Sequence, residues 1–409
     1  MSEVWIIDAM RTPRAIGKQG KGAVSHLHPQ HVLGQVLRAI ADRNALDTAD
    51  IDDVIIGCGT QTGSQGYCIA RMAALDAGYN VAAAGITVDR FCGSGLSAVN
   101  LAAMAIGSGF QDLLVAGGVE FMSYTTGLSR PPLLDAGNLS LRARHPQFSQ
   151  GLAADVIATL EGFSRADVDA YALSSHQRAA LAVAEGRFDK SLIAVRNHDG
   201  SIALDHEQFL RPGTDAATLV ALNLSFPALM DRPLDEDGLT HRQLIERTYP
   251  GLAIDHVHHA GNSSGVVDGA AAVILASPEY ARAHGLKPRA RIRSIANAGD
   301  APEIMLNAPG PAARKALAKA GMAVSDIDLF EVNEAFAAVP MKFIRDLGVD
   351  AGSVNVNGGA IALGHPIGAT GAMLVGTIID ELERRDLTTG LITLCTGGGM
   401  APATIVERI

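Results

Sequence analysis

One cysteine stands where the sequence could activate it as a nucleophile. Cys92 follows the β-branched residues 86–88, which are typical of a strand, and precedes small and apolar residues at 93–106 that predict a buried helix. A thiol at such a junction lies beside free backbone N–H groups and the positive end of the helix dipole, and both stabilise a thiolate. A buried free cysteine is more often a small apolar packing residue, so this segment alone leaves both interpretations open.

Three later residues could complete a catalytic site around this thiol. Asn333 and Cys395 each follow a short apolar segment that predicts a strand, and His365 lies in a glycine-rich loop before a predicted helix. The end of a strand is where ligands bind in open α/β sheets. A nucleophilic thiol, an imidazole base and a second thiol in one pocket would form a catalytic arrangement.

Ordinary structural roles compete with these chemical ones. Asn333 could cap the turn after its strand, and His365 could be a loop histidine without a chemical role. The histidine-rich segment 26–31 has no carboxylate or thiol companions, and the segment 256–259 leads directly into a turn. We therefore expect no metal at either segment.

The elements that must position these residues form an internal repeat. Segments 37–52 and 313–328 have the same length and pattern, a predicted helix followed by Asp-Ile-Asp at the start of a strand. Two copies of such a unit predict two similar α/β domains packed against each other. If they pack pseudo-symmetrically, Cys92 of the first copy faces His365 and Cys395 of the second.

Composition and charge narrow the class of protein. The chain has 409 residues, 48% of them hydrophobic and 19% charged, with 44 glycines, which is typical of an α/β protein of two or three domains. The net charge of −10 argues against a nucleic-acid partner, because no overall basic field is available to meet phosphates. No apolar run reaches the length of a membrane span, and no leader precedes the first predicted strand.

The cysteines indicate a reducing compartment. Cys58, Cys68, Cys92 and Cys395 are widely spaced and form neither a disulfide framework nor a zinc-type pair. We therefore expect a cytoplasmic protein that does not associate with a membrane.

Taken together, the motifs resemble those of the thiolases, the acetyl-CoA acyltransferases, over essentially the whole chain. The cysteine segment, NEAF at 333–336, GHPIGATG at 364–371 and CTGGG at 395–399 occur in the family's order and at family-like separations. The resemblance implies a five-layered αβαβα fold of two repeated halves with a loop domain inserted between them. The expected units are an N-terminal half at 1–121 completed by 266–288, an inserted coenzyme A-binding loop domain at 122–265, and a C-terminal half at 289–409.

The resemblance also implies a role for each candidate residue. Cys92 matches the nucleophile that becomes acylated, and His365 matches the histidine that activates it and helps to bind the thioester oxygen. Asn333 matches the residue that holds a water in that oxyanion hole, and Cys395 matches the second acid/base. The backbone N–H groups of Cys92 and Gly397 match a second oxyanion hole. The implied reaction is ping-pong cleavage of a 3-ketoacyl-CoA by coenzyme A, which in reverse is a Claisen condensation.

Coenzyme A contacts are implied in the third quarter of the chain. Arg211 resembles the arginine beside the adenine, Leu222 falls at a matching position, and Ser264 matches the serine that contacts the pantetheine arm. Coenzyme A would be a co-substrate, and the resemblance implies neither a metal nor a redox cofactor.

Two departures from compact short-chain biosynthetic members concern the acyl pocket. Ser149-Gln150 stand where those members have His-Met, and the segment between Phe226 and Ala260 is longer. Both change the expected walls of the pocket, so we expect a longer or bulkier 3-ketoacyl chain that is cleaved degradatively. A short-chain acetoacetyl-CoA thiolase working in the condensing direction is the alternative.

Two other functions are alternatives to a thiolase. Ketoacyl synthases also pair a cysteine with a histidine but lack the second thiol, so Cys395 argues against them. A non-catalytic acyl-CoA or lipid-binding relative would be expected to lose a catalytic position, and none is lost here. The family resemblance further implies a homodimer or homotetramer.

Overall fold

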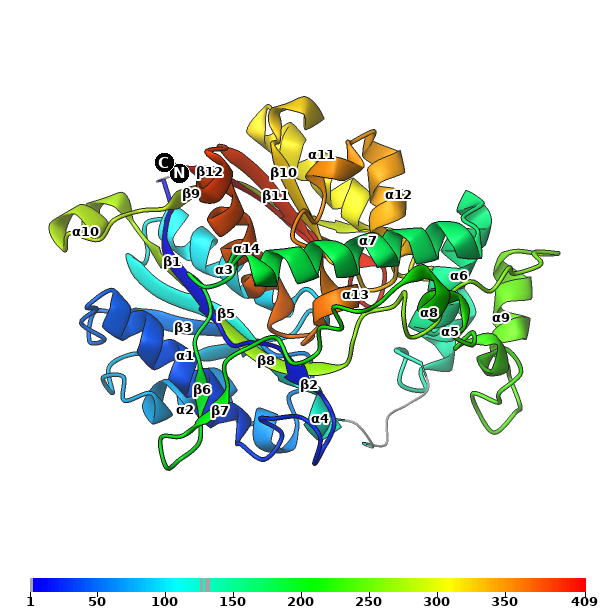
Figure 1. Ribbon diagram of the computed structural model, residues 1–409, viewed down its shortest axis with the longest axis horizontal. Coiled ribbons are helices and arrows are strands. Elements are labelled where there is room, and N and C mark those ends of the chain that lie inside the picture. The colour runs from blue at the N-terminus through cyan, green and yellow to red at the C-terminus, as the bar shows by residue number, and fades with distance from the viewer. Residues whose placement is uncertain (1–2, 126–127, 129–132) are drawn as a thin grey trace.

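Strands from both predicted halves lie in one mixed sheet of the computed structural model, which describes residues 3–125, 128 and 133–409. The N-terminal strands are β1 (Trp5–Arg11), β2 (Ala15–Ile16), β3 (Asp53–Gly57), β4 (Ile86–Val88), β5 (Leu113–Phe121) and β8 (Val267–Ala276). The C-terminal strands are β9 (Ala290–Gly299), β10 (Leu329–Val332), β11 (Thr389–Thr393) and β12 (Met400–Arg408). Their order is β10-β11-β12-β9-β1-β8-β5-β3-β4, and β2 pairs with β8 (Figure 1).

The first strand of the chain joins the two halves. Trp5 and Ile6 of β1 pair with Arg291 and Ala290 of β9, and β1 also pairs antiparallel with β8. Each half keeps a parallel pair from the predicted repeat, β3 with β5 and β10 with β11. The two sheet layers of the expected fold are therefore continuous through β1 and β9.

Two helices form the middle layer, and helices on the two outer faces complete the five layers. Helix α3 (Ser94–Gly107) and helix α14 (Thr370–Arg385) pack on each other and on strands of both halves. The outer faces are covered by α1 (Pro29–Arg43) and α2 (Ile69–Asp76) on one side and by α11 (Pro309–Ala320) and α12 (Ala338–Leu347) on the other. This arrangement confirms the αβαβα fold. Two short helices, α10 (Pro278–Ala283) and α13 (Ala360–Leu363), lie in connections.

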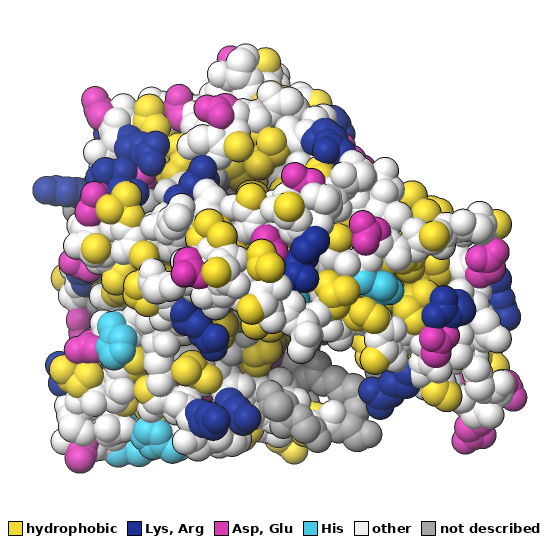
Figure 2. Space-filling model, turned by 45° about the vertical axis from the view of Figure 1, so that its right-hand side comes forward, with side chains coloured by type: hydrophobic (Ala, Val, Ile, Leu, Met, Phe, Trp, Pro, Cys, Tyr) yellow, Lys and Arg dark blue, Asp and Glu magenta, His cyan; other side chains and the backbone are white. Residues whose placement is uncertain are grey.

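The segment between the halves is mostly helical, and its proposed limits at 122–265 stay a prediction. In Figure 1 helices α5, α6, α8 and α9 gather beside the C-terminal half, while α7 crosses the front. On the face drawn in Figure 2, cationic and anionic side chains are interspersed rather than sorted by sign. The elements are α4 (Met122–Thr125), α5 (Leu139–Arg144), α6 (Gln150–Glu161), α7 (Arg165–Ala184), β6 (Val195–Arg196), β7 (Ile202–Leu204), α8 (Ala216–Val220) and α9 (His241–Thr248).

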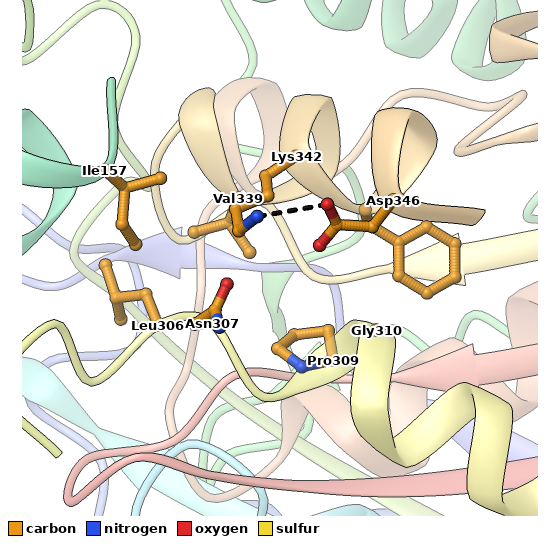
Figure 3. Close-up of a pocket in the computed structure, with 9 residues that line it drawn as sticks. Ile157, Leu306, Asn307, Pro309, Gly310, Val339, Lys342 and Asp346 are labelled. Carbon is orange, nitrogen blue, oxygen red and sulfur yellow. Dashed lines mark hydrogen bonds and ion pairs between the residues drawn. The ribbon is translucent and has the colours of Figure 1, made fainter. Parts of the chain in front are cut away.

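A small cavity marks the place where this segment meets the C-terminal half. It lies between α12, residues 306–310 and Ile157 of α6 (Figure 3). Lys342 and Asp346, one helical turn apart on α12, form an ion pair of 3.0 Å on its wall. None of the candidate catalytic residues lines this cavity, so we assign it no part in the chemistry.

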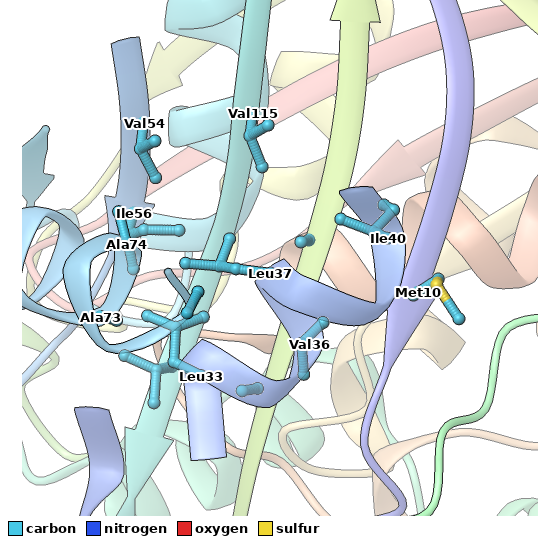
Figure 4. Close-up of a cluster of buried hydrophobic side chains, with 14 of the residues drawn as sticks. Met10, Leu33, Val36, Leu37, Ile40, Val54, Ile56, Ala73, Ala74 and Val115 are labelled. Carbon is cyan, nitrogen blue, oxygen red and sulfur yellow. The ribbon is translucent and has the colours of Figure 1, made fainter. Parts of the chain in front are cut away.

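Helix α1 shows how the sequence builds the outer layer. Pro29 occupies the first turn, where its missing N–H costs nothing, and the His28 side chain accepts from the Gln30 N–H. Leu33 and Leu37 lie one turn apart on the buried face and point toward β3 and β5 (Figure 4). Truncating one such buried leucine to alanine costs about 2–5 kcal/mol, so this face anchors the helix.

One strand of the repeat is missing from the second half. The segment that corresponds to β4 makes only an isolated bridge between Phe330 and Val354. The next residue, Asn355, has a left-handed backbone conformation (φ 49°). Its side chain accepts from the Val332 N–H (2.8 Å) and donates to the Val332 carbonyl (2.8 Å), which takes the place of a continued strand ladder. Sequence similarity between the copies could not reveal this exchange of backbone for side-chain bonds.

No described helix has both the length and the apolar character that crossing a bilayer requires.

Candidate active site

The predicted nucleophile lies in a tight turn between β4 and α3. Phe91 adopts a left-handed backbone conformation (φ 48°), and its N–H donates to the Asp89 carboxylate (2.7 Å). The Ser94 hydroxyl accepts from the Arg90 N–H (2.8 Å) and donates to the Phe91 carbonyl (2.6 Å). Cys92 is 6% exposed, and no other described residue accepts a hydrogen bond from its backbone N–H. The turn therefore holds the thiol at the start of α3 with a free N–H beside it.

The predicted base is held in one tautomer by its own loop. The Thr370 hydroxyl donates to the Pro366 carbonyl (3.0 Å), so it accepts from His365 Nδ1, which lies 2.6 Å away. The proton is therefore assigned to Nδ1, and Nε2 is left as the acceptor. The Asn333 amide Nδ2 lies 3.4 Å from this Nε2. His365 is thus oriented to receive a proton at Nε2, with Asn333 beside the same nitrogen.

Glycines bring the histidine loop of the second half onto the helix that follows Cys92. A side chain at Gly95 would lie 2.7 Å from the Gly368 carbonyl, and one at Gly371 would lie 2.2 Å from the Leu96 nitrogen. The Gly368 N–H donates to the Glu120 carboxylate at the end of β5 (3.0 Å). The close approach explains why small residues are needed on both sides of the contact. The two halves face each other here, as the repeat predicted.

The second thiol lies on another loop against the same turn. Cys395 is 1% exposed, and the negative charge of a Cys92 thiolate contributes to raising the pKa of Cys395, after the larger effect of burial. A side chain at Gly93 would lie 2.6 Å from the Thr396 methyl group, and one at Gly397 would lie 3.2 Å from the Phe91 ring. The Gly397 N–H donates to none of the described residues. Cys395 and Gly397 therefore lie on a loop against the Cys92 turn, and the loop of His365 packs on the helix that follows this turn.

Burial favours the neutral forms of the thiol and the imidazole. It raises the pKa of the Cys92 thiol to about 12, with a smaller contribution from the Glu120 carboxylate. Burial also lowers the pKa of His365 to about 3, and the positive charge of Arg14 adds to the effect. The resting pair is therefore a thiol and a neutral imidazole, which is the protonation state that a general base needs.

We predict that iodoacetamide alkylates Cys92 slowly and that the rate rises roughly 100-fold between pH 6 and pH 8, because a thiol whose pKa lies near 12 gains about tenfold more thiolate with each pH unit in this range. A thiol of ordinary pKa would carry on the order of 10³ times more thiolate at pH 7. The rate of labelling at each pH, followed by peptide mass spectrometry, measures the difference, and free cysteine is the reference thiol. A rate at pH 7 equal to that of free cysteine, or a rate that does not change between pH 6 and pH 8, would contradict a neutral thiol in the resting protein.

Two buried glutamates that the sequence did not indicate hold the segments of the site in place. Glu120 accepts from the Gly59 N–H (2.8 Å) as well as from the histidine loop, and thereby ties both segments to β5. Glu334 accepts from the Ser175 hydroxyl (2.6 Å) and from the Ile361 N–H (3.1 Å), which connects the NEAF segment to α7. Glu334 lies inside the NEAF motif, so the sequence could have indicated it as a functional residue. Glu120 follows a pair of glycines at the end of a strand, and no motif marks it.

The residues proposed for coenzyme A flank the turn at 260–265. The exposed Arg211 guanidinium lies over the Phe209 ring, 5.7 Å from its centroid, and that ring packs on Gly265. The Leu222 side chain lies against the other end of the turn at Gly261. The Ser264 N–H donates to Ala335 of the NEAF segment (2.9 Å), and the Gly265 carbonyl accepts from the His365 N–H (2.9 Å). The turn therefore leads from the surface to the buried base.

The histidines at 256–259 have carboxylate partners. His256 and His258 contact the two oxygens of Asp155, at 2.7 and 2.8 Å, and His259 contacts Asp169 at 2.7 Å. Among the described residues no group of histidine, cysteine and carboxylate side chains has the arrangement of a metal site. We interpret these contacts as structural bonds that hold α6 and α7 to the turn at 260–265.

The fold and the site define an α/β protein of two repeated halves with two buried thiols where the halves meet. The family model described as "Thiolase, N-terminal domain" matches residues 4–228, and "Thiolase, C-terminal domain" matches residues 286–408. The chain belongs to the thiolase family, and it is an acyltransferase.

Relatives match over all or nearly all of their length. The steroid 3-ketoacyl-CoA thiolase FadA6 of Mycobacterium tuberculosis is 40% identical over 420 residues, covering 100% of this chain and 95% of the relative. The 3-ketoacyl-CoA thiolase of Shewanella denitrificans is 38% identical over 419 residues, covering 100% of both. The crystal structure of human mitochondrial 3-ketoacyl-CoA thiolase superposes with a TM-score of 0.85 at 30% identity, covering 100% of this chain and 99% of that one.

Proposed function

We propose that this chain is a 3-ketoacyl-CoA thiolase that cleaves its substrate in two steps through an acyl group on Cys92. The observation that carries the proposal is the packing of the Cys92 turn and its helix against the loops of Cys395 and His365 from the other half, with Asn333 beside His365. Full-length relatives that bear this name support it.

The first step forms the acyl-enzyme. His365 Nε2 takes the proton of the Cys92 thiol, and the sulfur attacks the C3 carbonyl of the 3-ketoacyl-CoA. The free N–H groups of Cys92 and Gly397 and a water held by Asn333 are the donors we propose for the oxygens that gain negative charge. The C2–C3 bond breaks, its electron pair remains on C2 as the enolate of acetyl-CoA, and the Cys395 thiol protonates C2.

The second step transfers the acyl group to coenzyme A. The His365 imidazolium returns its proton to the Cys395 thiolate left by the first step, and His365 then takes the proton of the coenzyme A thiol, whose sulfur attacks the thioester carbonyl. The Cys92 thiolate leaves and recovers its proton from the His365 imidazolium. Each group therefore returns to its starting protonation state, and no external oxidant or reductant enters.

Arg211, Leu222 and Ser264 are the proposed coenzyme A contacts. Coenzyme A is highly anionic at its adenosine end, and the exposed guanidinium on Phe209 offers a fixed positive charge at the mouth of the path to His365. A raised KM for coenzyme A with an unchanged kcat in Arg211→Ala would support this placement. An unchanged KM would refute it for Arg211.

The acyl group we propose is longer or bulkier than acetoacetyl. The Gln150 side chain hydrogen-bonds the Cys92 sulfur from the start of α6, and the Phe226 ring packs on the adjacent Gly151. Leu134 lies against Gly397 and is 43% exposed. These residues give the space beside the thiol a polar group near the sulfur and apolar walls farther out.

A chain-length series tests the function and the substrate together. Coenzyme A-dependent loss of the 3-ketoacyl-CoA enolate absorbance would be compared between acetoacetyl-CoA and medium and long linear chains. We expect kcat/KM to rise with chain length. Activity on acetoacetyl-CoA alone would make this a short-chain enzyme, and inactivity on every linear chain with a reactive Cys92 would indicate a branched or cyclic acyl group.

The assembly and compartment are proposals of the same kind. We propose a homodimer or homotetramer, since β4 ends the sheet with an open edge on which Ile86 is 48% exposed. Light scattering gives the mass that tests this. The described cysteines are all free thiols, as a reducing compartment such as the cytoplasm would keep them.

A further inference from the structure

A small cavity adjoins the histidine loop on the inside of the molecule. Arg14, Glu331, Asn333 and Thr370 are among its lining residues, so it reaches both groups that contact the His365 imidazole. Its free space of about 10 Å³ is the size that one ordered water requires. The reaction described above assigns no role to Arg14 or to Glu331.

Three polar groups on this cavity have no protein partner. Asn333 Oδ1 and Arg14 Nε are buried without a hydrogen bond. The Glu331 side chain, on a residue only 3% exposed, has no hydrogen bond within the described part of the chain. Two other donors of Arg14 have a partner, because its backbone N–H and its Nη1 both bond Glu207, at 2.8 and 3.0 Å. An unsatisfied buried polar group costs about 1–3 kcal/mol, so the two unbonded atoms, Asn333 Oδ1 and Arg14 Nε, call for a partner that the neighbouring Glu331 carboxyl can share.

The three groups complement a single water molecule. Arg14 Nε–H is a donor and Asn333 Oδ1 is an acceptor. Burial raises the pKa of Glu331 well above its usual range, and the nearby Glu334 and Glu381 carboxylates add to the effect against the opposing charge of Arg14, so the net effect favours the protonated carboxyl. A protonated carboxyl donates. One water can accept from Arg14 and Glu331 and donate to Asn333, which gives it the bonds that buried waters usually make.

We propose that this cavity is a binding site for one structural water, and that Glu331 acts through it as a positioning residue for Asn333. The water fixes Oδ1, so the Nδ2 of the same amide must face His365 Nε2 and the substrate side. This water is distinct from the one proposed in the oxyanion hole, because the two occupy opposite ends of the Asn333 amide. The inference rests on the proposed function, since it supplies what orients an oxyanion donor of that reaction.

Two substitutions at Glu331 separate positioning from packing and from proton transfer. Glu331→Leu removes the donor but fills a buried position with an apolar side chain, which should leave the fold at least as stable. We expect its kcat to fall roughly 10- to 100-fold with KM for the 3-ketoacyl-CoA unchanged, because a misplaced catalytic donor has effects of that size. Glu331→Gln keeps a neutral donor of the same shape, so its kcat should stay within about threefold of the unmodified enzyme.

Thr377→Val is the matched control. Thr377 lines the same cavity, but its hydroxyl already donates to the Met373 carbonyl (3.0 Å), so the variant should keep full activity. A full kcat in Glu331→Leu would overturn the positioning role. A loss in Glu331→Gln equal to that in Glu331→Leu would overturn it too, in favour of a carboxyl that transfers a proton.

A crystal structure at high resolution gives a readout that does not depend on activity. We expect one water bonded to Arg14 Nε, Glu331 and Asn333 Oδ1 in the unmodified protein and in Glu331→Gln. In Glu331→Leu that water should be lost and the Asn333 amide rotated or disordered. An unmodified protein with a dry cavity would refute the proposal, even if the chain cleaves 3-ketoacyl-CoA. A chain that holds the water but cleaves no substrate would instead refute the proposed function.

Discussion

Cys92→Ala is expected to abolish coenzyme A-dependent cleavage of 3-ketoacyl-CoA, with kcat falling by roughly four orders of magnitude or more, as when other enzymes lose their nucleophile. The substitution removes one buried sulfur atom, and the turn that holds residue 92 is closed by Asp89 and Ser94 rather than by the thiol. The protein should therefore stay folded and still bind coenzyme A. The assay is the loss of enolate absorbance, with thermal unfolding as the check on the fold.

The matched control for this prediction is Cys68→Ala. Cys68 is also a free thiol, but it is exposed and donates to the Gly85 carbonyl (3.3 Å), away from the His365 loop. This variant should keep its activity. More than a hundredth of the normal rate in Cys92→Ala would mean that another group attacks the substrate.

Cys395→Ala is expected to separate the two halves of the reaction. Cleavage of the C2–C3 bond should slow by roughly 10²–10⁴-fold, because the enolate carbon loses its proton donor. Exchange of an acyl group between a saturated acyl-CoA and labelled coenzyme A needs only Cys92 and His365, so it should be kept within about tenfold. Measuring both rates in one variant distinguishes a proton donor from a packing residue.

Cys92→Ala is the reference variant for this second prediction. That variant should lose cleavage and exchange together, since both steps pass through its sulfur. If Cys395→Ala also lost both, the thiol would be needed to shape the pocket around Cys92, and its role as the second acid/base would have to be given up.

Local sequence was sufficient to predict two similar α/β halves and to indicate candidate residues, whereas the five-layered fold and the role of each residue came from the resemblance to the thiolases. The equal spacing of segments 37–52 and 313–328 predicted two halves. The structure adds the close approach at Gly95, Gly368 and Gly371, which the sequence did not predict. Such motifs can be recognised in the sequence because the turn that presents a catalytic side chain is formed by the few residues around it. For this reason residue types and spacing are enough to indicate Cys92, His365 and Cys395.

Interactions between distant segments could not be predicted in this way. The Glu331 carboxyl shares a cavity with Arg14, which lies more than three hundred positions earlier in the chain, and Glu120 bonds Gly368 of the other half. A sequence pattern shows a buried strand at 329–332 but not that an acid within it lacks a partner. Likewise, Asn355 replaces a strand ladder with side-chain bonds, which no periodicity reports.

The most direct test of the account is the mass of the protein after incubation with a medium-chain 3-ketoacyl-CoA in the absence of free coenzyme A. We expect one acyl group per chain, shorter than the substrate's acyl chain by two carbons and located on the peptide that contains Cys92. Adding coenzyme A should remove the group and release the matching acyl-CoA. An unmodified protein that still cleaves the substrate, or an acyl group on any other residue, would contradict the central claim that Cys92 carries the acyl group.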